Sequence, residues 1–75
     1  MVSLSDLQEN EECHIVGYSK GGTYRRQLLS LGLTPGTKIK MIRNAPLGDP
    51  VEFELLGFRL CLRRKEAGCI QIKKI

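Results

Sequence analysis

The chain has 75 residues, of which 41% are hydrophobic and 27% are charged, and its formal net charge is +4 at pH 7. A chain of this length is expected to form one domain, residues 1–75, whose core is too small to spare room for a deep substrate cleft. These values favour a compact binding module over a self-sufficient enzyme, and no catalytic residue is predicted.

Charge is unevenly distributed along the chain. All twelve Lys and Arg residues follow residue 12, whereas four of the eight acidic residues lie before residue 13. The basic remainder suits an anionic partner, and charge alone leaves an acidic protein face, a membrane surface and nucleic acid as alternatives.

The cysteines and the apolar runs indicate where the protein works. The three cysteines show no Cys-x-x-Cys spacing, and the N-terminus lacks the pattern of a secretory signal, so we expect reduced thiols and a cytoplasmic location. No apolar run approaches the roughly 20 residues that a membrane helix needs. Any membrane association is therefore expected to occur through a partner.

The N-terminal part predicts a short helical turn followed by a strand. Capping residues and the spacing of leucines favour a turn over Ser3–Leu7, and Asn10 marks the next change of direction. Cys13–Tyr18 then has the composition of a first strand, with Cys13 and Ile15 on one face.

A helix is predicted over residues 24–31. Thr23 is a suitable N-cap, and Gly32 can adopt the left-handed conformation that ends a helix. The helical spacing assigns its inner stripe to Tyr24, Leu28 and Leu31.

Two turns rich in Gly and Pro flank the next strand. Pro35-Gly36 presets a turn into a strand over Lys38–Arg43, and a second segment, residues 45–50, follows that strand. Pro46 and Pro50 restrict their own φ angles and the residues before them, so this loop is expected to be rigid and exposed.

The next two strands are predicted to form a hairpin. Apolar residues alternate in Val51–Leu55 and in Phe58–Arg63, and Leu56-Gly57 can form a tight turn between them. This register puts six apolar side chains on one face and sets Glu54 opposite Arg59 on the other. The cross-strand pairs are Leu55 with Phe58, Phe53 with Leu60, and Val51 with Leu62.

A last strand completes the predicted sheet. Arg64–Gly68 is expected to be a polar turn, after which Cys69–Lys73 alternates again and buries its isoleucines. Five short antiparallel strands in so short a chain are best satisfied by a small SH3-like barrel with the helix of residues 24–31 closing one side. The predicted fold is therefore mainly β.

Three segments resemble the FeoA family of small ferrous iron transport proteins. They are residues 24–36, with Leu-Gly-Leu-Thr-Pro-Gly at their end, residues 45–50, which read Ala-Pro-Leu-Gly-Asp-Pro, and residues 60–67. The resemblance runs from about Leu4 to Ile72, and Asn10 stands where such proteins often have Gly. It implies an SH3-like fold and a cytoplasmic accessory role in ferrous iron uptake. The implied partner is FeoB, a membrane ferrous iron transporter with a GTP-binding domain.

Two surfaces are candidates for contact with that partner. The rigid loop could present Leu47 to a pocket, or Leu47 could instead fold over the end of the barrel as core. The helix offers an outward basic face, although Leu28 is also expected to pack on the barrel. The predicted partner-binding residues are Arg25, Arg26, Leu28, Leu29, Pro46, Leu47, Gly48, Asp49 and Pro50.

No metal site or cofactor is predicted. The residues chemically able to ligate a metal show none of the usual ligand spacings, and Glu54 is expected to face Arg59 in an exposed ion pair. These residues are His14, Asp49, Glu52, Glu54 and Cys61.

Two other binding functions compete with the transport role. A small basic barrel can bind nucleic acid, but Phe53 and Phe58 are expected to be buried, which leaves only Tyr18 and Tyr24 to stack bases. Capture of a polyproline peptide requires an aromatic groove, and the chain has no Trp. Pairing of exposed strand edges leaves self-association open.

Overall fold

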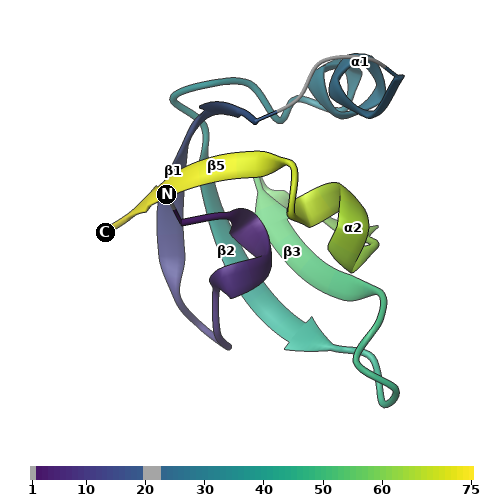
Figure 1. Cartoon of the computed structure of the whole chain (residues 1–75). Coiled ribbons are helices and arrows are strands. Elements are labelled where there is room, and N and C mark those ends of the chain that lie inside the picture. Colours follow the sequence, from purple (N-terminus) through teal and green to yellow (C-terminus); the bar gives the residue numbers. More distant parts are fainter. Residues whose placement is uncertain (1, 20–22) are drawn as a thin grey trace.

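The computed structural model describes residues 2–19 and 23–75. Its five strands form one antiparallel sheet in the order β4-β3-β2-β1-β5, which curls strongly on itself (Figure 1). The bounds are β1 (Glu12–Tyr18), β2 (Lys38–Asn44), β3 (Val51–Leu55), β4 (Phe58–Leu62) and β5 (Ile70–Lys74). The predicted SH3-like, mainly β fold is confirmed, and each predicted strand lies within one residue of its observed bounds.

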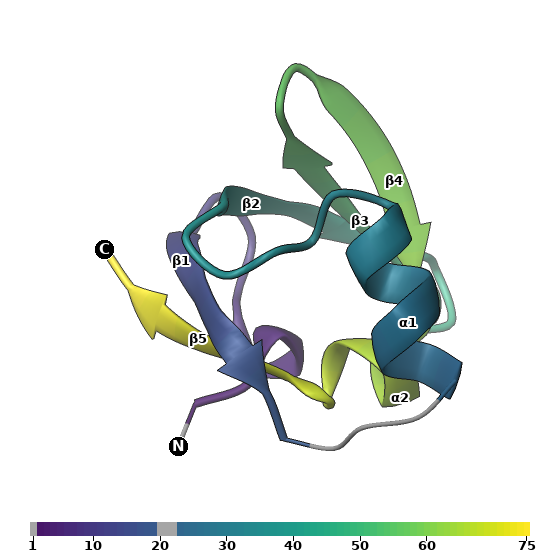
Figure 2. The ribbon, with the colours of Figure 1, turned by 90° about the horizontal axis from the view of Figure 1, so that it is seen from above.

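Three short helices accompany the sheet. They are the 3-10 helix η1 (Leu4–Asp6), α1 (Thr23–Ser30) and α2 (Arg64–Ala67). Figure 2 shows one end of α1 near the end of β4, and α2 lying between α1 and the start of β5. In the described part of the chain, no helix has the length and apolar character needed to span a bilayer.

The core is made by the inner faces of the strands and by residues beside the helices. β3 alternates strictly between buried and half-buried positions, and Phe53 at its centre is fully buried. Cys13 and Ile15 share one face of β1, as predicted, and that face points inward. The buried hydrophobic residues are Leu4, Leu7, Cys13, Ile15, Leu28, Leu33, Ile39, Met41, Val51, Phe53, Leu55, Leu62, Ala67, Ile70 and Ile72.

The β3–β4 hairpin has the predicted register, because Leu55 pairs with Phe58 and Val51 pairs with Leu62. The prediction was wrong for Phe58, which is 46% exposed. β4 is an edge strand, so Phe58 has a neighbouring strand on one side only, although its partner Leu55 on β3 is buried.

The end of α1 is fixed by Gly32, as predicted. Gly32 has φ +96 and donates its N–H to the carbonyl of Leu29, while the N–H of Leu33 donates to the carbonyl of Leu28. This pair of bonds is the Schellman motif, and it brings Leu33 over Leu28 in the core. Leu31, predicted to pack on the barrel, is instead 49% exposed, because it lies beyond the last helical residue and Leu33 takes its place.

The start of α1 also differs from the prediction. The helix begins at Thr23, so Thr23 is not the residue before the helix, and the connector of residues 20–22 lies outside the described residues. Tyr24 is 38% exposed instead of buried in the inner stripe, and the ammonium of Lys65 lies 5.9 Å from its ring centre.

Residues 64–67 form the helix α2 where a polar turn was predicted. The carboxylate of Glu66 accepts a hydrogen bond from the N–H of Arg63 at 2.8 Å, which satisfies a donor that the helix itself leaves free. Ala67 is fully buried and anchors α2 in the core. The local pattern looked polar because only this one small residue of α2 faces inward.

η1 is the predicted N-terminal turn, and it packs against α2. The N–H of Ser3 donates to the carboxylate of Asp6 at 2.9 Å, and this bond holds the pKa of Asp6 below its usual range. Together η1 and α2 cover one opening of the curled sheet, beside the end from which the loop of residues 45–50 projects (Figure 1).

Candidate partner-binding surface

The loop between β2 and β3, residues 45–50, is a closed turn that extends away from the sheet (Figure 1, bottom). The N–H of Gly48 donates to the carbonyl of Ala45 at 2.7 Å, and the N–H of Ala45 donates to the carbonyl of Pro50 at 3.0 Å. Gly48 has φ +87, a conformation that side chains disfavour, and the Asp49–Pro50 peptide bond is cis. Internal hydrogen bonds and two prolines thus define the shape of the loop.

Leu47 stands at the tip of this loop and is 96% exposed. Of the two positions considered for it, the structure shows the exposed one, since Leu47 does not fold over the end of the barrel. Pro46, Asp49 and Pro50 are also exposed, and Gly48 is half-buried. Burying a leucine side chain contributes about 1.5–3 kcal/mol, so Leu47 offers a large gain to a partner that covers it.

Arg64, the first residue of α2, holds the loop to the body of the protein. Its backbone N–H donates to the carboxylate of Asp49 at 2.9 Å, and its guanidinium donates to the side chain of Asn44 at 2.7 Å and to the carbonyl of Gly48. Asp49, predicted as a partner contact, therefore has a structural role. No sequence signal indicated Arg64, because its partners lie 15 to 20 residues away.

A shallow groove runs beside the base of the loop. Two prolines provide apolar surface, and a paired arginine and glutamate provide charge. The lining residues are Arg43, Asn44, Ala45, Pro46, Pro50, Glu52 and Cys61. The groove is continuous with the loop, so a partner that receives Leu47 would also contact this surface.

The helical candidates lie elsewhere. In Figure 1, α1 is at the top of the molecule and the loop is at the bottom, so the structure does not bring the two candidate surfaces together. Arg25 and Arg26 are exposed and Leu29 is half-buried. Leu28 is only 1% exposed and packs in the core, so its assignment to a partner-binding surface was wrong.

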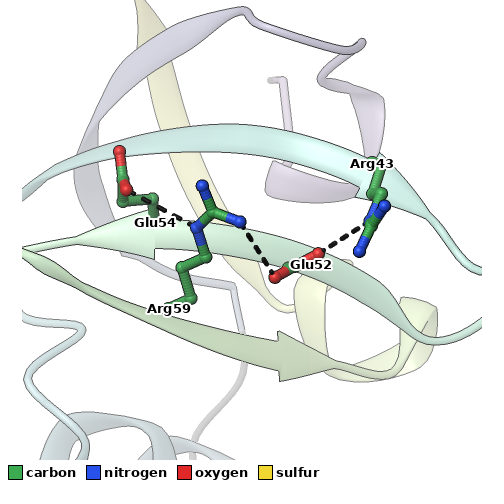
Figure 3. Close-up of polar contacts among 4 residues, drawn as sticks. All are labelled: Arg43, Glu52, Glu54 and Arg59. Carbon is green, nitrogen blue, oxygen red and sulfur yellow. Dashed lines mark hydrogen bonds and ion pairs between the residues drawn. The ribbon is translucent and has the colours of Figure 1, made fainter.

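The outer face of the β2–β3–β4 sheet carries alternating charges (Figure 3). The guanidinium of Arg59 lies 3.6 Å from the carboxylate of Glu54 and 3.7 Å from that of Glu52, which also binds Arg43 at 3.0 Å. The predicted Glu54–Arg59 pair is confirmed, and the extension to Glu52 and Arg43 was not foreseen. The carboxylates of Glu52 and Glu54 offset part of the positive charge of this face, to which Lys40 also contributes, since it pairs with Glu54 across β2 and β3.

The charge of this face bears on nucleic-acid binding. The argument that both phenylalanines are buried fails for Phe58, which is exposed together with Tyr24. Tyr18 packs against the core, and its hydroxyl donates a hydrogen bond to the carbonyl of Leu33 at 2.6 Å. Nucleic-acid surfaces combine stacking rings with a basic groove, and on the face of Figure 3 the carboxylates of Glu52 and Glu54 pair with Arg43 and Arg59 and so reduce its positive charge.

The thiols and possible metal ligands are dispersed. Cys61 is exposed, whereas Cys13 is buried. The burial of Cys13, together with the negative charge of Glu11, raises the pKa of the Cys13 thiol to about 11. His14 is exposed on β1. Among residues 2–19 and 23–75, no three His, Cys, Asp or Glu side chains are grouped as they would be to hold a metal ion.

Comparison with known proteins gives the family of this fold. The family model described as "FeoA domain" matches residues 2–74. A curated relative from Porphyromonas gingivalis (strain ATCC BAA-308 / W83), a fusion of Fe(2+) transport protein A with the Fe(2+) transporter FeoB, is 32% identical over 72 residues. That match includes 96% of this chain but only 8% of the fusion protein. The chain thus spans a small fraction of the length of this relative.

Solved structures agree in fold over almost the whole chain. The FeoA protein from Chlorobium tepidum is 36% identical, with a TM-score of 0.89, and the match covers 99% of this chain and 70% of that one. The zinc complex of Stenotrophomonas maltophilia FeoA, described as an SH3 domain protein, is 22% identical with a TM-score of 0.85. That match covers 97% of this chain and 91% of the other, and at this identity it shows the fold alone.

Proposed function

The chain belongs to the FeoA family, and we propose that it is a non-catalytic accessory protein of ferrous iron uptake. In this proposal it acts in the cytoplasm, binds the cytoplasmic part of a FeoB-type membrane transporter, and modulates that transporter or helps it to assemble. The protein would reach the membrane only through this partner.

The observation that carries the proposal is the exposed leucine on a held loop. Leu47 is 96% exposed at the end of a segment that Arg64 fastens at several points. An apolar anchor that is already ordered enters a pocket at a lower cost in conformational entropy than a mobile one. The loop therefore supports protein binding without any rearrangement of the fold.

The Porphyromonas gingivalis fusion supports the choice of partner. In that relative, the two proteins are parts of one polypeptide, which keeps their effective concentration high. A separate chain would obtain the same proximity by binding, with Leu47, Pro46 and Pro50 as the first contact.

Arg25 and Arg26 would form a second contact on the opposite end of the molecule, reached by an acidic part of the same partner. Binding that favours one conformation of the transporter shifts its population of states, and no chemical step is required of the accessory chain.

The experiment measures binding to the GTP-binding domain of a FeoB-type transporter by calorimetry, with and without GTP. Leu47→Asp removes the apolar anchor and is expected to weaken binding at least about tenfold, since a hot-spot side chain contributes about 2 kcal/mol or more. Thermal unfolding of the variant should match that of the wild type, because Leu47 is almost wholly exposed.

Leu56→Asp is the matched control. Leu56 is another exposed leucine at the tip of a turn, 72% exposed, and its replacement introduces the same charge. We expect it to leave binding unchanged. If folded Leu47→Asp binds as tightly as the wild type, the loop is not the docking site.

A further inference from the structure

We infer that Arg64 is a positioning residue, which holds the loop of residues 45–50 in the shape that presents Leu47 to a partner. The identity of the partner rests on the proposed function, whereas the role of Arg64 rests on the hydrogen bonds that it makes in the structure. It assigns a role to a residue outside the loop and outside both predicted contact surfaces.

Arg64 donates hydrogen bonds to both arms of the loop. The guanidinium donates to the side-chain oxygen of Asn44 at 2.7 Å and to the carbonyl of Gly48, and the backbone N–H donates to Asp49 at 2.9 Å. Asn44 precedes the loop, whereas Gly48 and Asp49 follow its tip. One residue therefore ties the two arms of the loop together on either side of Leu47.

Arg64 is itself held in place by α2. It is the first residue of α2, and α2 is anchored by Ala67, which is fully buried. The first N–H groups of a helix have no partner within the helix, so the carboxylate of Asp49 supplies one from the loop. The chain of contacts thus runs from the core through α2 to the loop.

The shape of the Arg64 guanidinium suits it to holding the loop. A guanidinium is planar and holds its N–H donors in a fixed fork, so two bonds in different directions define one orientation of the loop. A lysine ammonium at this position is a single point of charge on a flexible stem. Arg64→Lys is therefore expected to keep the charge and lose the geometry.

The consequence is a binding-ready loop. When only a fraction of molecules has the competent loop, the apparent affinity falls by that fraction. The two prolines restrict the backbone angles of the loop itself, and Arg64 restricts the loop through hydrogen bonds from α2. Removing Arg64 should thus weaken binding through loop order alone, because Leu47 itself is unchanged.

The primary test needs no partner. Backbone order parameters of Leu47 and Gly48 are measured by NMR for the wild type and for Arg64→Gln. We expect values typical of rigid backbone, about 0.85, in the wild type and values below about 0.6 in the variant. Lys73→Gln, which removes an equal charge from an exposed position on β5, is the control and should leave the loop ordered. Unchanged order in Arg64→Gln overturns the inference.

Three further variants keep the test valid if Arg64→Gln unfolds. Asn44→Ala removes a single contact of the guanidinium and should loosen the loop in part. Asp49→Ala should loosen it too, whereas Asp49→Asn keeps an oxygen that accepts the N–H of Arg64 and should restore order. Equal order in both Asp49 variants contradicts the role of this bond.

Binding to the GTP-binding domain of a FeoB-type transporter is the second readout. Arg64→Gln should bind on the order of three- to tenfold more weakly, and the combination with Leu47→Asp should lose no more than Leu47→Asp alone. A loosened loop with full affinity overturns the inference. Full affinity of Leu47→Asp instead shows that the loop is not the docking site, and failure of the wild type to bind overturns the proposed function, so these failures are distinguishable.

Discussion

Two turns of this protein carry a leucine at the tip, and they differ in what holds the leucine. Leu47 lies in the loop of residues 45–50 and is 96% exposed, and Leu56 is the first residue of the β3–β4 turn and is 72% exposed. By exposure alone, both would be candidates for contact with a partner.

The backbone separates them. Leu56 has φ +51 and Gly57 has φ +83, so the β3–β4 turn is of the two-residue type that favours Asn-Gly. The side chain of Leu56 also leans toward the end of α1, since its terminal carbon lies 3.6 Å from the position of a Cβ on Gly32. In the other loop the left-handed conformation is taken by Gly48, and Leu47 is held away from the body. The two leucines therefore differ in their surroundings, because Leu56 lies near Gly32 at the end of α1, whereas Leu47 extends away from the body and is available to a partner.

The largest expected effect is on the free energy of unfolding, and it contrasts a buried leucine with the exposed leucine of the loop. Leu55, directly before the β3–β4 turn, is 2% exposed, and Leu55→Ala should lower the free energy of unfolding by about 2–5 kcal/mol. Leu47→Ala should change it by less than about 0.5 kcal/mol. Urea denaturation of both variants measures the difference, and a comparable loss in Leu47→Ala would show that the loop tip has a structural role.

The glycines of the two turns give the next effect. Gly48 and Gly57 both have positive φ, and a Cβ on either would meet no other atom within 4 Å. Alanine at each position should therefore cost about 1–2 kcal/mol through backbone strain alone. Only Gly48→Ala should also weaken binding to the proposed partner, measured by calorimetry. Equal binding by the two variants would remove the distinction between the turns.

A smaller effect of opposite sign is expected at Leu56. Leu56→Asn places a residue that tolerates the left-handed region before Gly57, and it should raise the free energy of unfolding by about 0.5–1 kcal/mol. In a domain of this size, thermal unfolding should shift upward by about 2–8 °C. Leu47→Asn is the control and should leave the midpoint unchanged. A lower midpoint for Leu56→Asn would mean that its contact beside Gly32 outweighs the strain.

The sequence predicted what depends on local pattern. Alternation and turn chemistry gave the five strands and the register from Val51 to Leu62, and the glycine rule gave the end of α1 at Gly32. The exposed loop was predicted too, because its two prolines and its glycine favour a turn within six residues.

The parts that the sequence did not predict depend on contacts between distant segments. Arg64 reaches the loop from 15 to 20 residues away, and nothing within residues 60–67 indicates this. Leu31 was expected in the core and is exposed, because the turn at Gly32 brings Leu33 into the core instead. Burial at the edge strand was overestimated at Phe58, since alternation shows which face a residue takes but not how far the core extends.

The smallest expected effect contrasts Arg59 of the hairpin with Arg64 of the loop. The bonds of Arg59 are exposed ion pairs with Glu52 and Glu54, so Arg59→Gln should cost less than about 1 kcal/mol. At about 1 M salt, where the screening length falls to about 3 Å, this cost should nearly vanish. Arg64 instead donates its guanidinium hydrogen bonds to an amide and a backbone carbonyl, which are uncharged. The loss of unfolding free energy in Arg64→Gln should therefore persist at high salt. Denaturation at low and high salt compares the two variants, and equal salt sensitivity would show that Arg64 also acts by charge.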